Sequence, residues 1–416
     1  MASIVIAPTN VASCPDVGGH FWVYMQYAQA LLRLGCEVHW LERFRRTADE
    51  DRDRASIATF LEHMRVFGMG DKVILYTVRD AAEGELPCEF LNVSQAEAER
   101  VIDGADLLLN FYYAIEPALL RRFRRTAIVD IDPGLLQFWM TCGQIWVPKH
   151  DLYFTTGETV GTRRARFAER GVEWRHIRPP VCLELWPYCY DDSSGPMTTV
   201  SGWWGGDGKG EWVTDGKAVM FENNKRVTFM QYVELPRRTS QALELALSLG
   251  EGEPPVREQF QQRGYSWSSA VPCRKDITDY ESDEKDRRLL EYHGWRVIHA
   301  REAARTPQRY QQYVQQSRGE FSCAKPSYVY FQNAWVSDRT ICYLASGKPV
   351  VVQHTGPSEY LPNGEGMFRF STMDEAVSAL ARVNADYQRH CRAARELAET
   401  HFDGCQILAG VLDAAL

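Results

Sequence analysis

The sequence predicts an α/β protein with two doubly wound parallel sheets that face a cleft. Short apolar runs rich in β-branched residues alternate with segments of helical spacing, and turns rich in Gly, Pro, Asn and Asp separate them. This order is typical of βαβ units. The alternation occurs on both sides of an aperiodic stretch, 181–196, which ends in turn residues. We therefore expect two domains, with ligands bound beyond the carboxyl ends of their strands.

The first half of the chain shows the βαβ pattern most clearly. The run SIVIA at 3–7 suits a buried parallel strand, and a loop rich in Pro, Gly, Asn and Asp follows it. The segment 21–35 has helical spacing and a stop signal at Gly35. Further strands are predicted at 36–42, 71–78, 105–113, 126–132, 151–157 and 173–180.

The second half repeats the pattern less regularly. Strands are predicted at 197–204, 294–300 and 348–356, and helices at 337–347 and over 371–402, the latter as one or two helices. The segment 306–323 reads as a helix that runs into a short strand. The segment 227–250 is predicted to be an extended piece, a turn and a helix. The stretch 250–290 is polar and broken by Gly and Pro, so it receives no assignment.

Bulk composition narrows the class of protein. A length of 416 residues corresponds to two or three ordinary domains, and 45% hydrophobic with 25% charged residues is typical of globular proteins. A net charge of −8 argues against nucleic acid as a partner. No apolar run approaches 18 residues and the N-terminus lacks signal-peptide features, which predicts a cytoplasmic protein without a transmembrane segment. The eleven cysteines are scattered singly, so neither a disulfide framework nor a zinc site is expected.

The first candidate site is the run Asp16-Val17-Gly18-Gly19-His20. Glycines allow a sharp turn after a strand and a close approach of the backbone to a ligand. The helix that follows offers free N–H groups and a positive dipole end, which favour a phosphate. His20 at its start suits a general base near neutral pH, with Asp16 beside it. The alternative is a tight βα turn with a surface histidine.

The second candidate site spans 337–366. Ser337 or Asp338 is a good N-cap, so another helix start is available to an anion. An apolar strand follows, and beyond its carboxyl end come Thr355, Gly356 and Glu359. A carboxylate in such a loop can accept hydrogen bonds from sugar hydroxyls. A plain structural αβα repeat is the alternative.

This second segment carries a family resemblance. ICYLASGKPVVVQHTGPSEYLP, followed by GEGMFRFSTMDEAVSAL, resembles the donor-binding half of GT-B glycosyltransferases, and W-x-SDR-T together with the N-terminal GGH and DIDPG resembles a bacterial branch of that superfamily. The resemblance implies two Rossmann-like domains, an acceptor domain at 1–192 and a donor domain at 193–395, with a terminal helix at 396–416 that returns to the first domain.

The resemblance also implies how the donor is bound. GT-B enzymes generally need no catalytic metal, so helix N-termini and basic residues stabilise the diphosphate; Lys325 and Arg339 are the candidates, with Gly18 and Gly19 at the other helix start. The only co-substrate expected is a nucleotide-diphosphate sugar, UDP- or TDP-linked, without a further cofactor.

Two positions depart from the family pattern. Cys342 stands where many GT-B enzymes have a ribose-binding glutamate, and Ala334 stands where a retaining-type pair would have its other glutamate. Asp338 lies one helical turn from Cys342 on the same face and is expected to substitute for the ribose ligand. These departures leave retention or inversion open.

Weaker signals complete the predicted site. Asp130-Ile131-Asp132 imitates the DxD metal motif of GT-A enzymes, but its place in the first half predicts an acceptor-facing role for Asp132, shared with Glu158. No metal site is predicted. The sequence thus predicts a hexosyl-type glycosyltransferase acting on a small-molecule or glycan acceptor. A GT-B epimerase or hydrolase, or a non-catalytic nucleotide-sugar-binding protein, remains as the alternative, and an oligomer is not excluded.

Overall fold

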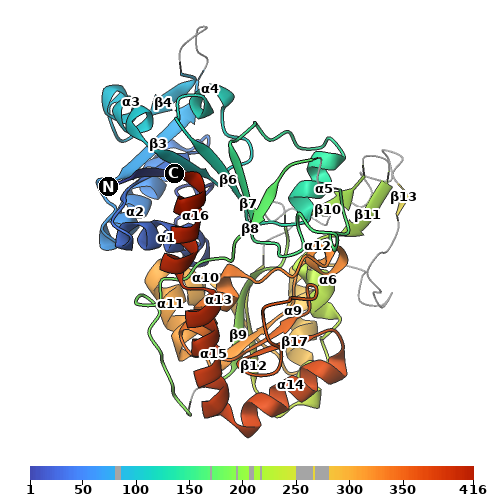
Figure 1. Cartoon of the computed structure of the whole chain (residues 1–416). Coiled ribbons are helices and arrows are strands. Elements are labelled where there is room, and N and C mark those ends of the chain that lie inside the picture. Colours follow the sequence, from blue (N-terminus) through green and yellow to red (C-terminus); the bar gives the residue numbers. More distant parts are fainter. Residues whose placement is uncertain are drawn as a thin grey trace.

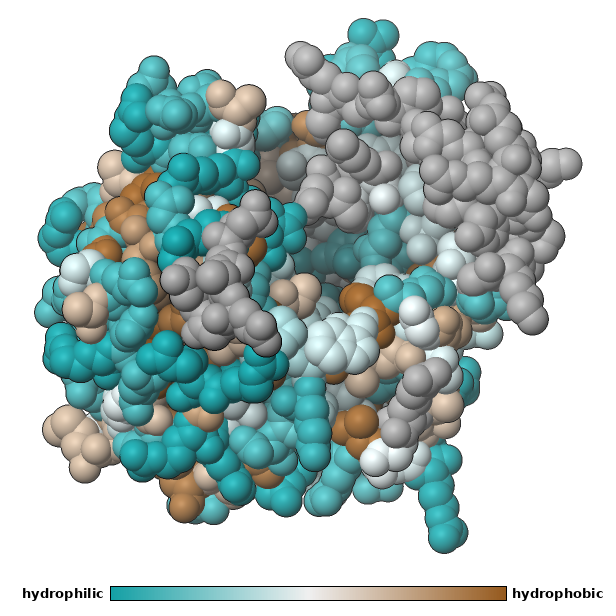
Figure 2. All heavy atoms as spheres, turned by 90° about the horizontal axis from the view of Figure 1, so that it is seen from above, coloured by the Kyte–Doolittle hydropathy of each residue, from teal (hydrophilic) through white to brown (hydrophobic). Residues whose placement is uncertain are grey.

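The computed structural model of the chain describes residues 1–79, 86–168, 171–193, 195–205, 210–215, 218–249, 266–267 and 281–416. Two lobes lie one above the other, and the C-terminal helix rises from the lower lobe to the upper one (Figure 1). The face seen from above is largely hydrophilic and is hollowed near its middle (Figure 2).

The first domain is built on an eight-stranded sheet of order β4-β3-β2-β1-β5-β6-β7-β8. All neighbours are parallel except β3 and β4. The strands are β1 Ser3–Ala7, β2 Glu37–Arg43, β3 Val73–Val78, β4 Cys88–Phe90, β5 Leu107–Asn110, β6 Thr126–Asp130, β7 Leu152–Thr155 and β8 Trp174–His176. The helices are α1 Gly18–Arg33, α2 Glu50–Val66, α3 Gln95–Gly104, α4 Pro117–Leu120 and α5 Leu135–Thr141.

The second domain is built on a six-stranded parallel sheet of order β14-β12-β9-β15-β16-β17. The strands are β9 Met197–Gly202, β12 Leu243–Ser248, β14 Arg296–His299, β15 Gly319–Ser322, β16 Val350–Gln353 and β17 Met367–Phe370. A separate three-stranded sheet joins β10 Trp212–Thr214, β11 Ala218–Glu222 and β13 Ser266–Trp267.

Short helices connect these strands, and long helices follow them. They are α6 Lys225–Met230, the 3₁₀ helix η1 Leu235–Arg238, α9 Asp283–Tyr292, α10 Ala300–Ala304, α11 Pro307–Gln316, α12 Pro326–Phe331, α13 Asp338–Ala345, α14 Met373–Ala385, α15 Tyr387–His401 and α16 Gly404–Ala415. Across the described segments, no helix is both long and apolar enough to cross a membrane.

The prediction for 227–250 is wrong for its extended piece and for its helix. The expected extended piece belongs to α6, and the expected helix is the strand β12. Leu243–Ser248 contains good helix formers, but it lies between β9 and β14, where its apolar side chains are buried. Tertiary packing therefore overrides helix propensity here. Most of 250–290 lies outside the described residues, apart from β13 and α9.

The chain passes between the two sheets twice, in adjacent places. Val181 donates a backbone hydrogen bond to Phe402, and Gly404 donates one to Val181, so the two crossings are joined. After the second crossing α16 packs on α1. The two sheets are separate and parallel, apart from the edge strand β4, and the terminal helix lies on the first domain. This arrangement confirms the predicted fold class.

Candidate active site

A cavity of about 860 Å³ lies at the carboxyl ends of both sheets. Thr9 and Asp132, which follow β1 and β6, line it from the first domain. Ser201 in β9 and Ser248 at the end of β12 line it from the second. Both domains therefore contribute to one site, at the position where parallel α/β sheets bind ligands.

Three basic side chains gather at the second-domain end of the cavity: Lys225, Lys325 and Arg339. Arg339 is paired with the buried Glu320, its Nε 2.7 Å from the carboxylate. Lys325 Nζ lies 3.0 Å from Glu211. The Lys225 ammonium, in contrast, forms no hydrogen bond or ion pair within the described part of the chain.

The environment of Lys225 favours an anion. Burial, followed by the charges of Arg339 and Lys325, lowers the pKa of Lys225 well below its ordinary value. An unpaired, half-buried cation is costly unless a counter-charge arrives. The N-terminus of α13, which faces the same cavity, adds free N–H groups and a positive dipole end. This end of the cavity is therefore built to hold a phosphate-like anion.

Ser337 and Asp338 have separate roles at the start of α13. Ser337 is the N-cap, and its Oγ accepts a hydrogen bond from the Arg339 backbone N–H at 3.3 Å. Asp338 is the first helical residue, and it lines the cavity. Burial, followed by the charge of Asp132, raises the pKa of Asp338 to about 6. The helix is thus capped without the Asp338 carboxylate, which is available to a ligand.

His20 lies in the first turn of α1 and lines the cavity. Its Nε2 is 2.8 Å from the carbonyl oxygen of Thr9, and its ring packs edge-on against Tyr24. A carbonyl only accepts, so Nε2 carries the proton and Nδ1 is the unprotonated nitrogen of a neutral ring. Burial lowers the pKa of His20, which keeps the ring neutral near pH 7. The imidazole is therefore in the form required of a base.

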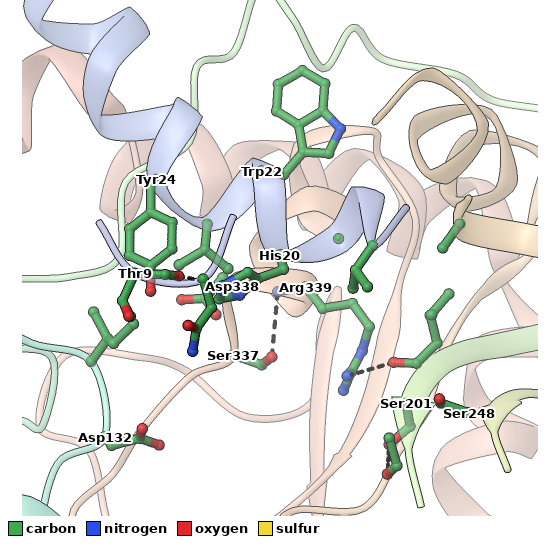
Figure 3. A pocket seen from close by; sticks show the side chains of 18 of the residues that line it. Thr9, His20, Trp22, Tyr24, Asp132, Ser201, Ser248, Ser337, Asp338 and Arg339 are labelled. Carbon is green, nitrogen blue, oxygen red and sulfur yellow. Dashed lines mark hydrogen bonds between the residues drawn. The ribbon is translucent and has the colours of Figure 1, made fainter. Parts of the chain in front are cut away.

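Asp132 and an aromatic pair line another part of the cavity. Tyr328 donates its hydroxyl to Asp132 at 2.5 Å, and its ring stacks on Trp335 with centroids 3.9 Å apart and planes at 4°. In Figure 3 Asp132 lies at one end of the cavity and Ser201 and Ser248 at the other, with His20, Asp338 and Arg339 between them.

The Asp130-Ile131-Asp132 motif is split between the core and the cavity. Asp130 is fully buried and accepts hydrogen bonds from Gln137 and Thr155, each at 2.8 Å. Burial raises the pKa of Asp130 to about 6. Of the two carboxylates in the motif, that of Asp132 lines the cavity and that of Asp130 does not; Ile131 lines it as well. In the described ranges no three His, Cys, Asp or Glu side chains are grouped so that they could hold a metal ion.

The two glycines before His20 differ in their surroundings. Gly19 lines the cavity, beside the ring of Tyr310. Gly18 is buried against the backbone of Thr306 in the second domain. Asp16 also lines the cavity, and its carboxylate pairs with Arg301 of α10 at 2.7 Å, across the two domains.

Four further predicted residues lie outside the cavity lining: Glu158, Thr355, Gly356 and Glu359. Glu158 accepts hydrogen bonds from the Ser358 hydroxyl and the Glu359 backbone N–H. Thr355 donates its hydroxyl to the Trp335 carbonyl. The acidic loop after β16 therefore joins the two domains. The Glu359 carboxylate in this loop pairs with Arg164 at 3.4 Å.

Cys342 and Ala334, the two residues that depart from the family pattern, each have a distinct structural setting. Cys342 accepts a hydrogen bond from Gln26 of α1, with N and S 3.7 Å apart. Ala334 adopts a left-handed backbone, with φ of 57°. The face of α13 that carries Cys342 is thus contacted by the first domain.

Several cavity residues were not identified from the sequence: Lys225, Ser201, Ser248, Tyr328 and Tyr24. One sequence signal could have located Lys225. Asn224, directly before it, is a residue type that often precedes the first turn of a helix. The polar, glycine-rich stretch before it obscured the start of α6.

Two Rossmann-like domains that face a cleft, with the last helix returned to the first domain, define the GT-B fold of glycosyltransferases. Solved structures match this chain over its whole length. An alpha-glucosyltransferase (AGT) solved with UDP aligns with a TM-score of 0.56 at 11% identity, covering 100% of this chain and 99% of that one. HepE of Anabaena, solved with UDP and glucose, aligns with a TM-score of 0.54 at 12% identity, covering 100% of both.

A sucrose-phosphate synthase from Thermosynechococcus elongatus aligns with a TM-score of 0.51 at 11% identity, covering 100% of this chain and 98% of that one. By sequence, the chain matches no family model and no curated protein. The structural matches establish the GT-B fold of this chain.

Proposed function

We propose that this protein is a glycosyltransferase that moves a hexosyl group from a UDP- or TDP-sugar to a small-molecule or glycan acceptor. The observation that carries the proposal is the unpaired Lys225 ammonium beside the N-terminus of α13, in a cavity that also holds the neutral imidazole of His20. An anion site and a base in one cleft are what glycosyl transfer requires. The structures matched above include proteins solved with UDP, which supports the choice of nucleotide.

In the proposed reaction, the diphosphate binds at Lys225, Lys325 and the free N–H groups of α13. The bond between the sugar carbon and the phosphate oxygen breaks, and the negative charge that develops on the diphosphate is stabilised there. For direct displacement, the acceptor oxygen bonds to the sugar carbon as the diphosphate leaves, and Nδ1 of His20 takes the proton of the acceptor hydroxyl. In a retaining reaction the leaving phosphate takes that proton instead, and His20 then has only a binding role.

The acceptor is proposed to bind at the end of the cavity lined by Asp132. The stacked Tyr328 and Trp335 give this end a flat apolar wall, and Tyr113 and Ile145 also line it. Sugar rings and other flat molecules pack well on aromatic faces. We further propose that the reaction needs no divalent cation, because Asp130 and Asp132 use their carboxylates in hydrogen bonds within the protein.

A second candidate is hydrolysis or epimerisation of the nucleotide sugar itself. The carboxyl groups of Asp132 and Asp338, one from each domain, favour it, because they line the same cavity. A non-catalytic nucleotide-sugar-binding role is the third candidate, since Cys342 and Ala334 replace both glutamates of the family pattern.

The three candidates are separated by one series of measurements. UDP-, TDP- and GDP-sugars are first screened by thermal unfolding, since a ligand that binds the folded state raises the melting temperature. The best donor is then incubated alone and with a panel of sugar and phenolic acceptors. We expect release of the nucleotide diphosphate to depend on an acceptor. Release at the same rate without acceptor would show the hydrolase, and conversion of the sugar without release would show the epimerase. Binding with neither reaction would show the third role.

A further inference from the structure

A second cavity, of about 350 Å³, lies between β8 and α16. Within the described segments, it shares no lining residue with the active-site cavity. Its lining residues come from β7, β8 and the segment just after β8, and from one face of the C-terminal helix: Phe154, Arg175, His176, Ile177, Arg178, Ile407, Gly410 and Ala414.

The strand side of this cavity is strongly basic. Among the residues that the structure describes, Arg175, His176 and Arg178 are its only ionisable lining residues, although the chain as a whole carries a net charge of −8. Arg175 is 43% exposed and faces Glu173 only at 3.6 Å. One guanidinium nitrogen of Arg178, Nη2, is buried without a hydrogen-bond partner in the described structure. These cations therefore lack a full set of acceptors.

His176 adds no charge to this cavity near neutral pH. Burial, and then the charge of Arg178, lowers the pKa of His176 to about 4, and Glu158 offsets this only partly, so the positive charge here belongs to Arg175 and Arg178. The Arg178 guanidinium is covered on one side by the ring of Tyr360, 5.3 Å from its centroid. A ligand with negative charge would neutralise this group of side chains.

The helix side of the cavity is apolar. Ile407, Gly410 and Ala414 are spaced three and four residues apart, so they form one stripe along α16. Phe154 and Ile177 face them from the first-domain sheet. Gly410 leaves the stripe open, since a Cβ added there would meet no atom within 4 Å.

We propose that this cavity binds an amphiphile with a phosphate monoester head and an apolar tail. Arg175 and Arg178 bind the phosphate, whose oxygens match the fork of a guanidinium. The tail lies along the α16 stripe, which removes apolar surface from water. Because β8 and α16 both line the cavity, its ligand contacts both the first-domain sheet and the helix that returns from the second domain.

Calorimetric titration with octyl phosphate below its micellar concentration tests the proposal. UDP is present at saturation, so that the active-site anion position is occupied. We expect octyl phosphate to bind at one saturable site. Its affinity should be at least tenfold higher than that of inorganic phosphate and that of octanol. Equal affinity for octyl phosphate and inorganic phosphate, or for octyl phosphate and octanol, would reject the amphiphile.

Variants locate the binding site. Gly410→Glu adds a carboxylate at the cavity and should weaken octyl phosphate at least tenfold. Gly410→Ala should bind like the wild type, because a Cβ there meets no atom within 4 Å. Arg175→Glu should weaken binding to the same extent. Lys225→Ala, in the active site, should leave it unchanged. Undiminished binding to Gly410→Glu and Arg175→Glu, or loss of binding in Lys225→Ala, would overturn the assignment. Melting temperatures near that of the wild type verify that each variant is folded.

Discussion

The carbonyl oxygen of Thr306 lies 2.3 Å from the position that a Cβ atom on Gly18 would occupy. Gly18 begins α1 of the first domain, and Thr306 is the N-cap of α11 in the second. Only a glycine lets these two backbones come so close. Gly18, two residues before His20, therefore permits the close contact between the two domains. The ion pair between Asp16 and Arg301 lies beside this contact.

Gly18→Ala should therefore disturb the closed cleft. A methyl group at this position overlaps backbone atoms, which cannot rotate away, and overpacking of this kind costs about 1–3 kcal/mol. We expect a lower melting temperature and at least a tenfold lower transfer rate. Gly104→Ala at the end of α3 is the control, since its Cβ meets nothing within 4 Å. If the two variants are equally active and stable, the contact does not set domain closure.

Lys225→Ala should weaken UDP binding about ten- to a hundredfold, because charged hydrogen bonds contribute roughly 1.5–3 kcal/mol each. The pKa of Lys225 is lowered in the free protein, and the negative charge of a bound diphosphate should raise it. Calorimetry measures the affinity of both proteins for UDP. Lys285→Ala on the exposed surface of α9 is the control. Equal affinity in wild type and Lys225→Ala would place the diphosphate elsewhere.

The sequence predicts the first domain better than the second, for a physical reason. The strands around α1 are apolar runs bounded by turn residues, so local signals and tertiary burial agree there. At Leu243–Ser248 they conflict, and burial between β9 and β14 decides the outcome. Local patterns report propensity, and they cannot report which strands lie beside a segment.

The same limit applies to the candidate site. His20, Asp338 and Arg339 were found because helix starts after glycine-rich or capping residues have local signatures. Glu359 follows an equally good signature, yet its loop faces Glu158 across the domains. Lys225 was missed because the absence of a counter-charge is a property of the folded surroundings.

His20→Ala should keep UDP affinity and lower the transfer rate by about 10²- to 10⁴-fold, as expected for loss of a general base. His20→Gln can still donate to the Thr9 carbonyl but cannot take a proton, so it should be equally slow. Added imidazole should restore part of the rate in the alanine variant. Rates close to that of the wild type in both variants would favour the retaining route, in which the leaving phosphate takes the proton.

The pH profile of transfer gives an independent test of the same residue. The base acts in its neutral form, and burial lowers the pKa of His20 below its ordinary value of 6.5. The midpoint of the decline of the wild-type rate at low pH should therefore lie below pH 6.5. The residual rate of His20→Ala should lack this decline. A decline with its midpoint above pH 6.5 would assign the base to another group.

Transfer should persist in excess EDTA, because in the proposed reaction Lys225, Lys325 and α13 hold the diphosphate, and because the carboxylates of the Asp130–Asp132 motif are engaged in hydrogen bonds. The rate is measured before and after dialysis against EDTA, with added Mn²⁺ as the control. Complete loss in EDTA with recovery in Mn²⁺ would require a cation at the diphosphate.

Asp338→Asn should stabilise the protein at neutral pH. Its pKa is raised from 3.8 to about 6, so the folded state binds the proton more tightly than the unfolded state. The ionised carboxylate therefore destabilises the fold above pH 6, and this effect fades as pH falls toward 4. After allowance for partial solvent exposure the gain is about 1–2 kcal/mol. Melting temperatures at pH 7.5 and pH 4.5 measure it, and an equal gain at both would rule out titration of this group.

The same variant tests what Asp338 binds. Ser337 supplies the cap of α13, so the Asp338 carboxylate is free to accept hydrogen bonds from the ribose hydroxyls of the donor. Asparagine keeps the size of the side chain but is a weaker acceptor, because its charge is gone. We expect Asp338→Asn to lose about tenfold or more in affinity for UDP, and much less for 2′-deoxy-UDP, which lacks one of the hydroxyls. Calorimetry with both nucleotides makes the comparison, and Asp374→Asn on the exposed start of α14 is the control. Equal small losses for the two nucleotides would show that Asp338 does not bind the ribose, and its carboxylate would then be assigned to the sugar or acceptor side of the cavity, next to Asp132.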